Sequence, residues 1–186
     1  KPIGPFYTEE SARQHMEGEG WLMIDDAGRG WRRVVASPKP IAIVEEASIR
    51  TLLANDIIVV AAGGGGIPVV EKEDGSLEGI GAVVDKDLAS SLLARNLGAE
   101  LLVISTSVDK VALNYRQPDQ RDIDSMTVAE ASRYLEEGQF APGSMKPKIE
   151  ASIQFLRGGG KRVIICQPHD LDEAMEGATG THIVPD

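Results

Sequence analysis

From about residue 41 to the end of the chain, short apolar runs alternate with segments whose apolar residues recur at helical spacing. The predicted strands cover residues 57–62, 101–104, 162–166 and 182–184. The predicted helices cover residues 49–53, 88–97, 127–138 and 171–175, and a further helix begins near Pro147. The β-branched run 57–62 is expected to be a strand buried on both faces. This alternation predicts an α/β layer structure with a mainly parallel sheet.

The first 40 residues differ from the rest of the chain. They contain both tryptophans and several arginines and glycines, show little periodicity, and end at Pro38 and Pro40. We therefore predict a small β-rich or irregular subdomain over residues 1–40 and an α/β part over residues 41–186. Because the chain enters a stiff proline-containing segment directly at Lys1, we also expect that the native gene product has an amino-terminal portion before this residue.

Composition narrows the possible functions. The 186 residues include 29 acidic and 19 basic side chains, so the net charge of -10 argues against general nucleic-acid binding. The run 57–62 is far too short to span a bilayer, and the cytoplasm is the default compartment. The three histidines lack metal-ligand spacing, so no metal site is predicted. The single cysteine, Cys166, lies in an apolar run and is expected in the core.

The segment 141–148, Ala-Pro-Gly-Ser-Met-Lys-Pro-Lys, predicts a tight loop that leads into a helix. Pro147 suits the first turn of a helix, and apolar residues follow at helical spacing. Lys146 and Lys148 therefore lie beside free backbone N–H groups and the positive end of the helix dipole. Such an arrangement can bind phosphate, although the pattern alone is equally typical of two solvated charges beside an ordinary helix start.

Four glycines, residues 63–66, directly follow the predicted strand 57–62. In open α/β folds, ligands bind at the carboxyl ends of the strands, and glycines let the backbone approach a small anion closely. The spacing matches neither the P-loop nor the dinucleotide fingerprint. A flexible loop without a ligand remains the alternative.

The tripeptide Asp85-Lys86-Asp87 immediately precedes a predicted helix. Either aspartate could simply cap the helix, but capping does not account for Lys86. A cation between two carboxylates, near a phosphate site, could position and neutralise a transferring phosphoryl group. Further along, Thr106 and Asp109 follow the predicted strand 101–104 as small polar and acidic residues. By themselves these two residues are ordinary loop chemistry.

In combination, these motifs resemble those of the carbamate kinases, which belong to the amino-acid kinase family. The matching segments are 1–7, 35–40, 62–68, 84–87, 107–111 and 140–148. The resemblance implies a three-layer αβα sandwich with a protruding subdomain. It also implies the reaction ATP + carbamate ⇌ ADP + carbamoyl phosphate, with Mg²⁺ accompanying the nucleotide, in a protein that usually forms a homodimer. In arginine fermentation such enzymes run toward ATP.

The same resemblance implies roles for individual residues. Lys86 and Lys148 are similar to the lysines that neutralise the transferring group, and Asp87 to the residue hydrogen-bonded between them. Lys1 is similar to the lysine that reaches the acyl-phosphate end. The residues that would line the carbamate pocket are Gly63, Gly64 and Gly65. Those expected around the nucleotide are Thr106, Val108, Asp109, Asn114, Tyr115, Met145 and Lys146.

The chain departs from the family pattern in two ways. The family's amino-terminal portion, with its Gly-Gly-Asn-Ala turn, is absent, and Gly81 occupies a position that is often acidic. Two other functions stay open: a non-catalytic module that binds ATP or ADP, and a kinase of the same family that acts on an amino acid. The segment 1–40 argues against the second of these, because it resembles carbamate kinases in particular.

Overall fold

The computed structural model describes residues 1–26 and 28–186, and it divides the chain into two compact units. The first unit contains residues 1–39 and 66–85, and the second contains residues 40–65 and 86–186. The sequence-based division at residue 40 assigned residues 66–85 to the α/β part. In the structure these residues cluster with the first 39, and a backbone hydrogen bond from Val83 N–H to the Ala36 oxygen (2.9 Å) helps to hold them there.

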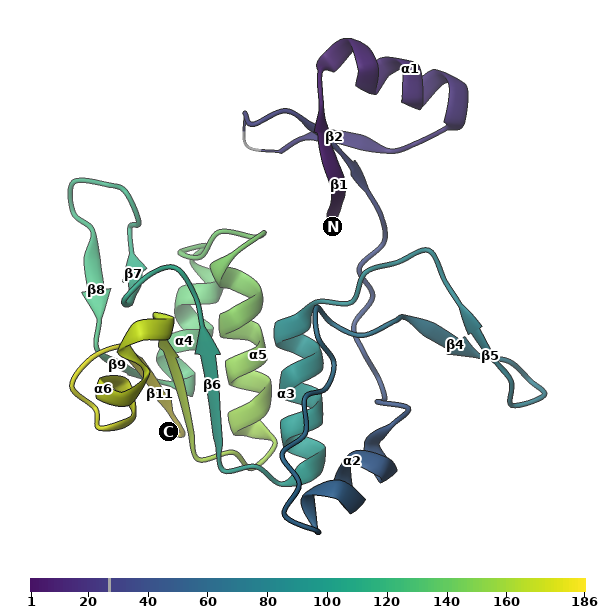
Figure 1. Ribbon diagram of the computed structural model, residues 1–186. Helices are drawn as coiled ribbons and strands as arrows, with labels where there is room; N and C mark the ends of the chain where they lie inside the picture. Colours follow the sequence, from purple (N-terminus) through teal and green to yellow (C-terminus); the bar gives the residue numbers. More distant parts are fainter. Residues whose placement is uncertain (27) are drawn as a thin grey trace. The chain divides into compact units, whose positions relative to one another are not determined.

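A four-stranded sheet forms the centre of the second unit (Figure 1). Its strands, in spatial order, are β6 (Leu101–Ser105), β10 (Arg162–Cys166), β11 (Thr181–Val184) and β9 (Ser125–Thr127). The pairs β6–β10 and β11–β9 are parallel, whereas β10 and β11 are antiparallel. The sheet is therefore mainly parallel, as the alternation of apolar runs and helical segments predicts.

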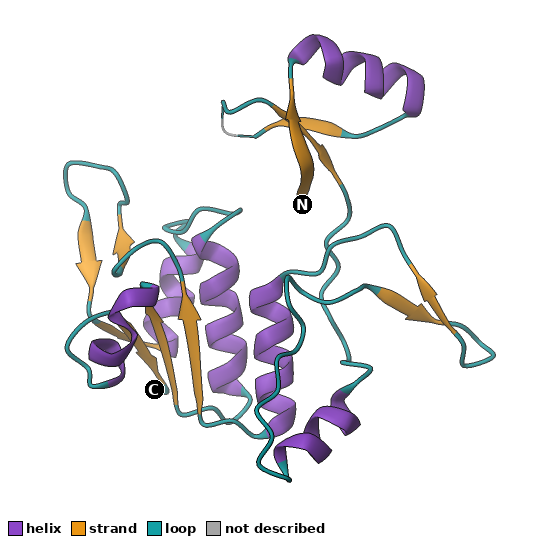
Figure 2. Ribbon diagram, viewed as in Figure 1, coloured by secondary structure: helices purple, strands orange, loops and turns teal. Residues whose placement is uncertain are grey.

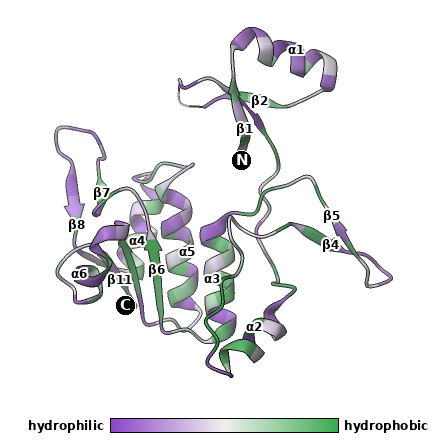
Figure 3. Cartoon of the chain, viewed as in Figure 1, coloured by the Kyte–Doolittle hydropathy of each residue, from purple (hydrophilic) through white to green (hydrophobic). Residues whose placement is uncertain are grey.

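Helices cover both faces of this sheet. Along β10, Val163 and Ile165 belong to the large core that includes α5 (Met145–Arg157), while Ile164 and Cys166 pack with Ala174 of α6 (Leu171–Met175). Successive side chains of a strand point to opposite faces, so an apolar run without alternation is what a strand covered on both sides requires. Figure 3 shows the hydrophobic colouring of β6 between these helices. The second unit is thus a three-layer α/β structure.

The remaining elements of the second unit surround this core. They are α2 (Glu46–Leu53), α3 (Lys86–Leu97), α4 (Val128–Glu136), the hairpin β7 (Val111–Leu113) and β8 (Arg121–Ile123), and a 3₁₀ turn at Pro168–Asp170. Cys166 is buried as expected, and burial raises the pKa of its thiol above the ordinary value. Among residues 1–26 and 28–186, no helix has both the length and the apolar character needed to cross a bilayer.

A capping box is present at Thr127, where the predicted helix 127–138 and helix α4 begin. The Thr127 hydroxyl accepts the Glu130 N–H at 3.3 Å, and the Glu130 carboxylate accepts the Thr127 N–H at 2.9 Å. Thr127→Ala is expected to lower the free energy of unfolding by about 1 kcal/mol, because one N–H of the first turn loses its acceptor. Urea denaturation followed by far-UV circular dichroism measures this change, and Thr127→Ser, which keeps the hydroxyl, should restore most of it.

The predicted strand at residues 57–62 is wrong. In the structure this segment is a loop between α2 and β4 (Figure 2), and its large side chains are exposed, Ile58 by 93% and Val60 by 96%. A β-strand needs a neighbouring strand to satisfy its backbone N–H and C=O groups. No described residue pairs with this segment in a sheet.

The first unit contains a three-stranded antiparallel sheet in the order β1 (Pro2–Tyr7), β3 (Trp31–Val34), β2 (Met23–Asp25). It also contains helix α1 (Glu9–Glu19) and the hairpin β4 (Val69–Glu71) and β5 (Leu77–Gly79). The prediction of a β-rich region missed α1. This helix is mostly polar, and its ends are fixed by the Thr8 side chain, which accepts the Ser11 N–H, and by Gly20 in a left-handed conformation.

Candidate active site

Two helices of the second unit, α3 and α5, begin at the same end of the molecule and lie side by side (Figure 1). The first residue of α3 is Lys86, and that of α5 is Met145. Inside their contact, the buried Ser91 hydroxyl donates to the Ala151 carbonyl oxygen at 2.8 Å. The dipole of each helix places a partial positive charge at its start. The two starts together therefore form a region suited to anions.

A buried ion pair connects these two helix starts. The Lys148 ammonium donates to the Asp87 carboxylate with an Nζ–Oδ2 distance of 2.9 Å, and each side chain is only 9% exposed. Removing two charges from water is costly, and a buried pair of this kind is weak evidence for stabilisation by itself. Its position at two helix N-termini instead fits a role in which Asp87 holds the Lys148 ammonium in a fixed place.

The structure distinguishes the lysines that the sequence grouped together. Lys146, one residue into α5, is exposed, whereas Lys148 is buried. Lys86 is exposed at the first position of α3, so its ammonium is accessible to a ligand. Of the two lysines in segment 141–148, only Lys148 is bonded to Asp87.

In the first unit, Lys1 forms an ion pair with Asp85, a carboxylate that is only 4% exposed. The two aspartates of the tripeptide thus bind different lysines, Asp85 binding Lys1 and Asp87 binding Lys148. Both carboxylates are buried. The role of Lys1 at the acyl-phosphate end stays a prediction.

The glycine segment forms a tight turn. Gly63 has a φ of 40° and Gly65 a φ of 129°, both in the range that favours glycine. Their N–H groups donate within the segment, from Gly63 to the Ala61 oxygen at 2.8 Å and from Gly65 to the Ala62 oxygen at 2.6 Å. Gly63 and Gly64 are exposed. A role of Gly63, Gly64 and Gly65 in a carbamate pocket would therefore require these N–H groups to leave their present acceptors, and it stays a prediction.

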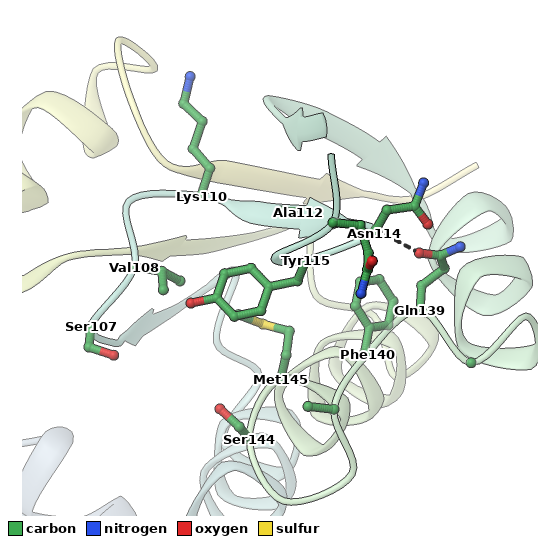
Figure 4. A pocket seen from close by; sticks show the side chains of 13 residues that line it. Ser107, Val108, Lys110, Ala112, Asn114, Tyr115, Gln139, Phe140, Ser144 and Met145 are labelled. Atoms are coloured by element: carbon green, nitrogen blue, oxygen red, sulfur yellow. Dashed lines mark hydrogen bonds between the residues drawn. The ribbon is translucent and has the colours of Figure 1, made fainter. Parts of the chain in front are cut away.

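A pocket of about 440 Å³ lies beside the start of α5 in the second unit (Figure 4). It lies between the loop after β6, the hairpin β7–β8 and the segment that joins α4 to α5. The lining residues are Ser107, Val108, Lys110, Ala112, Asn114, Tyr115, Gln117, Gly138, Gln139, Phe140, Ala141, Ser144 and Met145. Its size is that of a small-molecule site.

Four of the seven residues predicted around a nucleotide line this pocket: Val108, Asn114, Tyr115 and Met145. The other three are not among its lining residues. The Thr106 N–H donates to the Cys166 oxygen at 2.9 Å between neighbouring strand ends, Asp109 accepts a hydrogen bond from Gln167, and Lys146 is exposed. Sequence reasoning missed Gln139 and Phe140, although the quoted motif at 140–148 begins at Phe140.

The pocket is suited to an uncharged, flat group. Figure 4 shows the Tyr115 ring beside the Met145 side chain, with Phe140 nearby, whereas the charged end of Lys110 points away from Tyr115. That end pairs with Asp124, and the hydrogen bond that the Lys110 ammonium donates to this carboxylate raises the pKa of Lys110. Aromatic and thioether side chains with a few neutral polar groups are suited to a heterocyclic base.

Among residues 1–26 and 28–186, no three His, Cys, Asp or Glu side chains come together as a metal site would require. Asp87 is engaged by Lys148. Mg²⁺ is commonly held by one or two carboxylates together with substrate phosphates and water. A Mg²⁺ ion that enters with the nucleotide, as the resemblance to carbamate kinases implies, needs only such partial coordination by the protein.

The fold and this arrangement of lysines at helix starts define a class of protein. The sequence model of the amino acid kinase family matches residues 13–167, and the chain belongs to that family. Within the family it is similar to carbamate kinases. It is 51% identical to the carbamate kinase of Clostridium perfringens over 185 residues, and 48% identical to the carbamate kinase-like protein YahI of Escherichia coli over 186 residues.

Solved structures give the same result for the fold. The carbamate kinase of Giardia lamblia bound to AMP-PNP superposes with a TM-score of 0.87 at 42% identity, covering 100% of this chain and 59% of that chain. The chain covers 59% of the Clostridium protein and 58% of the Escherichia coli protein. It thus has the amino-acid kinase fold and spans just under three-fifths of the length of these relatives.

Proposed function

We propose that this chain supplies the nucleotide-binding and phosphate-neutralising part of a carbamate kinase, which transfers a phosphoryl group between ATP and carbamate. The observation that carries the proposal is the buried Lys148–Asp87 pair at the adjoining starts of α3 and α5. The identity of about one half to carbamate kinases supports it. The AMP-PNP complex of the Giardia relative supports an ATP-type nucleotide.

In this reaction a carbamate oxygen attacks the γ-phosphorus of ATP. The bond between that phosphorus and the oxygen that bridges to the β-phosphate breaks, and ADP leaves with the electron pair. Phosphoryl transfer needs little covalent help from the protein and depends on position and charge neutralisation. Lys148, fixed by Asp87, and the exposed Lys86 neutralise charge on the transferring group, assisted by the two helix dipoles. When bound, Mg²⁺ would add charge neutralisation on the nucleotide phosphates.

The pocket between the hairpin and α5 receives the base of the nucleotide in this proposal. Tyr115 and Met145 contact the flat faces of the base, and Asn114 and Val108 border it. The pocket lies beside the start of α5, so the phosphates extend toward Lys148. By resemblance to carbamate kinases, the proposal also includes a homodimer, a location in the cytoplasm and a role in arginine metabolism.

Lys86→Ala is expected to lower the rate of ATP formation from carbamoyl phosphate and ADP by about 10²–10³-fold, as loss of one preorganised transition-state donor does. Since Lys86 is exposed, the melting temperature should stay near that of the wild type. The assay uses the protein at its natural length. Unchanged turnover would remove Lys86 from the mechanism.

The same assay separates the competing functions. Binding of AMP-PNP without any formation of ATP by the wild type favours a nucleotide-binding module over an enzyme. Phosphorylation of an amino acid with none of carbamate favours another kinase of the family. Formation of ATP from carbamoyl phosphate and ADP supports the proposal.

A further inference from the structure

The loop that contributes Tyr115 to the pocket contains two residues in an unfavourable backbone conformation. Asn114 has a φ of 50° and Arg116 a φ of 63°, and they flank Tyr115 in the loop between β7 and β8. A side chain other than glycine in the left-handed region costs on the order of 1 kcal/mol or more, although asparagine tolerates it better than most residues. Other interactions must therefore hold this loop in place.

Hydrogen bonds supply that restraint. The Asn114 backbone N–H donates to the Gln139 side-chain oxygen at 2.9 Å, and the Asn114 side-chain amide donates to Asp119 at 2.7 Å. The Arg116 N–H donates to the side-chain oxygen of Gln120 at 2.8 Å. The bond to Gln139 differs from the other two because its acceptor comes from outside the loop. It ties the loop to the segment between α4 and α5, which forms the opposite side of the same pocket.

These bonds restrain the backbone on both sides of Tyr115. Tyr115 is half exposed, so packing alone does not fix its backbone, yet its ring borders the pocket beside Met145. If the loop were free, nucleotide binding would have to order both the loop and this side chain, at a cost in conformational entropy. A loop held in the binding conformation beforehand avoids that cost.

We infer that Gln139 is a positioning residue for nucleotide binding: its side-chain oxygen, together with Asp119, holds Asn114 in the left-handed conformation that presents Tyr115 to the base. This inference rests on the proposed function, because it assigns the base to this pocket. It concerns the affinity for the nucleotide and not the chemical step. Gln139 acts through the loop, so its loss should leave the phosphoryl-transfer machinery intact.

Gln139→Met in the protein at its natural length keeps the length of the side chain and removes the oxygen acceptor. We expect the dissociation constant of AMP-PNP, measured by isothermal titration calorimetry, to rise about tenfold. Binding would then have to order the Tyr115 side chain, and the entropy cost of ordering one large side chain corresponds to a change of about this size. The KM for ADP should rise in parallel while kcat stays within about twofold. Gln139→Glu, which keeps an acceptor oxygen, should bring the dissociation constant back to within about threefold of the wild type. A purely structural role would not produce this rescue.

Asp119→Ala provides an independent variant, since Asp119 is exposed and its replacement does not disturb the core. It should weaken AMP-PNP binding several-fold for the same reason. Equal affinity in the wild type, Gln139→Met and Asp119→Ala would overturn the inference and leave the proposed function in place. Failure of the wild type to bind AMP-PNP would instead contradict the proposed function itself.

Discussion

Replacing Lys148 with alanine is expected to lower turnover by about 10²–10³-fold, a loss of the same order as that expected for Lys86→Ala. Lys148 is buried and donates a hydrogen bond to Asp87 at the start of α5. Its ammonium group sits in a region of low dielectric, where a fixed charge acts more strongly on a developing negative charge than it would in water. The rate of ATP formation from carbamoyl phosphate and ADP measures the effect.

Loss of Lys148 should also affect stability, and the two effects need to be separated. Removing one partner of a buried ion pair typically costs about 3–5 kcal/mol, because the other charge stays buried without it. Turnover should therefore be measured well below the melting temperature and per mole of folded protein. Lys148→Met, which fills the space of the side chain, should recover part of the stability and none of the activity.

Lys161→Ala is the matched control. Lys161 forms an ion pair with Glu100, but both side chains are 70% exposed, and exposed pairs of this kind contribute little. Its replacement should leave turnover and stability close to the wild type. Wild-type turnover in Lys148→Ala or Lys148→Met would remove this lysine from the mechanism.

The sequence located the lysine pair but could not by itself decide between two solvated charges and a phosphate site. Helical spacing indicates that Lys148 lies on the buried face of the helix, because it comes four residues before Ser152 and eight before Leu156. All three are buried in α5. Lys146 lies off this row and is exposed. The partner of Lys148 could be proposed only from the family resemblance, since Asp87 is 61 residues away in the chain.

The predicted strand at 57–62 and the missed helix α1 failed for different physical reasons. The run 57–62 has strand-like residues, but a strand forms only with a neighbour, and pairing is not a local property. Helix α1 has few apolar residues, and its capping residues Thr8 and Gly20 were overlooked. Local patterns predicted α3, α5 and β10 well, because each of these elements has a large buried face.

The pocket was predicted only in part for a related reason. Val108 and Met145 lie in the motifs at 107–111 and 140–148, and Asn114 and Tyr115 closely follow the first of these. Gln139 was missed, because its contribution is a hydrogen bond to a backbone N–H 25 residues earlier in the chain. Such a bond depends on how the hairpin and the segment before α5 pack together, which residue spacing does not reveal.

Phe155→Ala is expected to lower the free energy of unfolding by about 3–5 kcal/mol, the largest loss of stability from a single core substitution here. Phe155 is fully buried in the core between α5 and the sheet. Its ring also lies against the backbone at Gly160, where a Cβ atom would collide with three ring carbons. Urea denaturation followed by far-UV circular dichroism gives the change, and Leu53→Ala, at a side chain that is 44% exposed, should cost far less.

The contact between Phe155 and Gly160 allows a sharper test than either substitution alone. Gly160→Ala should destabilise the wild type, because a close-packed core has no room to move the ring away from the new methyl group. In the Phe155→Ala background the ring is gone, so the added methyl group enters the cavity and should cost little or even stabilise the protein. The two changes are therefore expected to be strongly non-additive. The double variant should lose less free energy of unfolding than the two single variants lose together. Simple additivity would show that the ring does not fill the space beside Gly160.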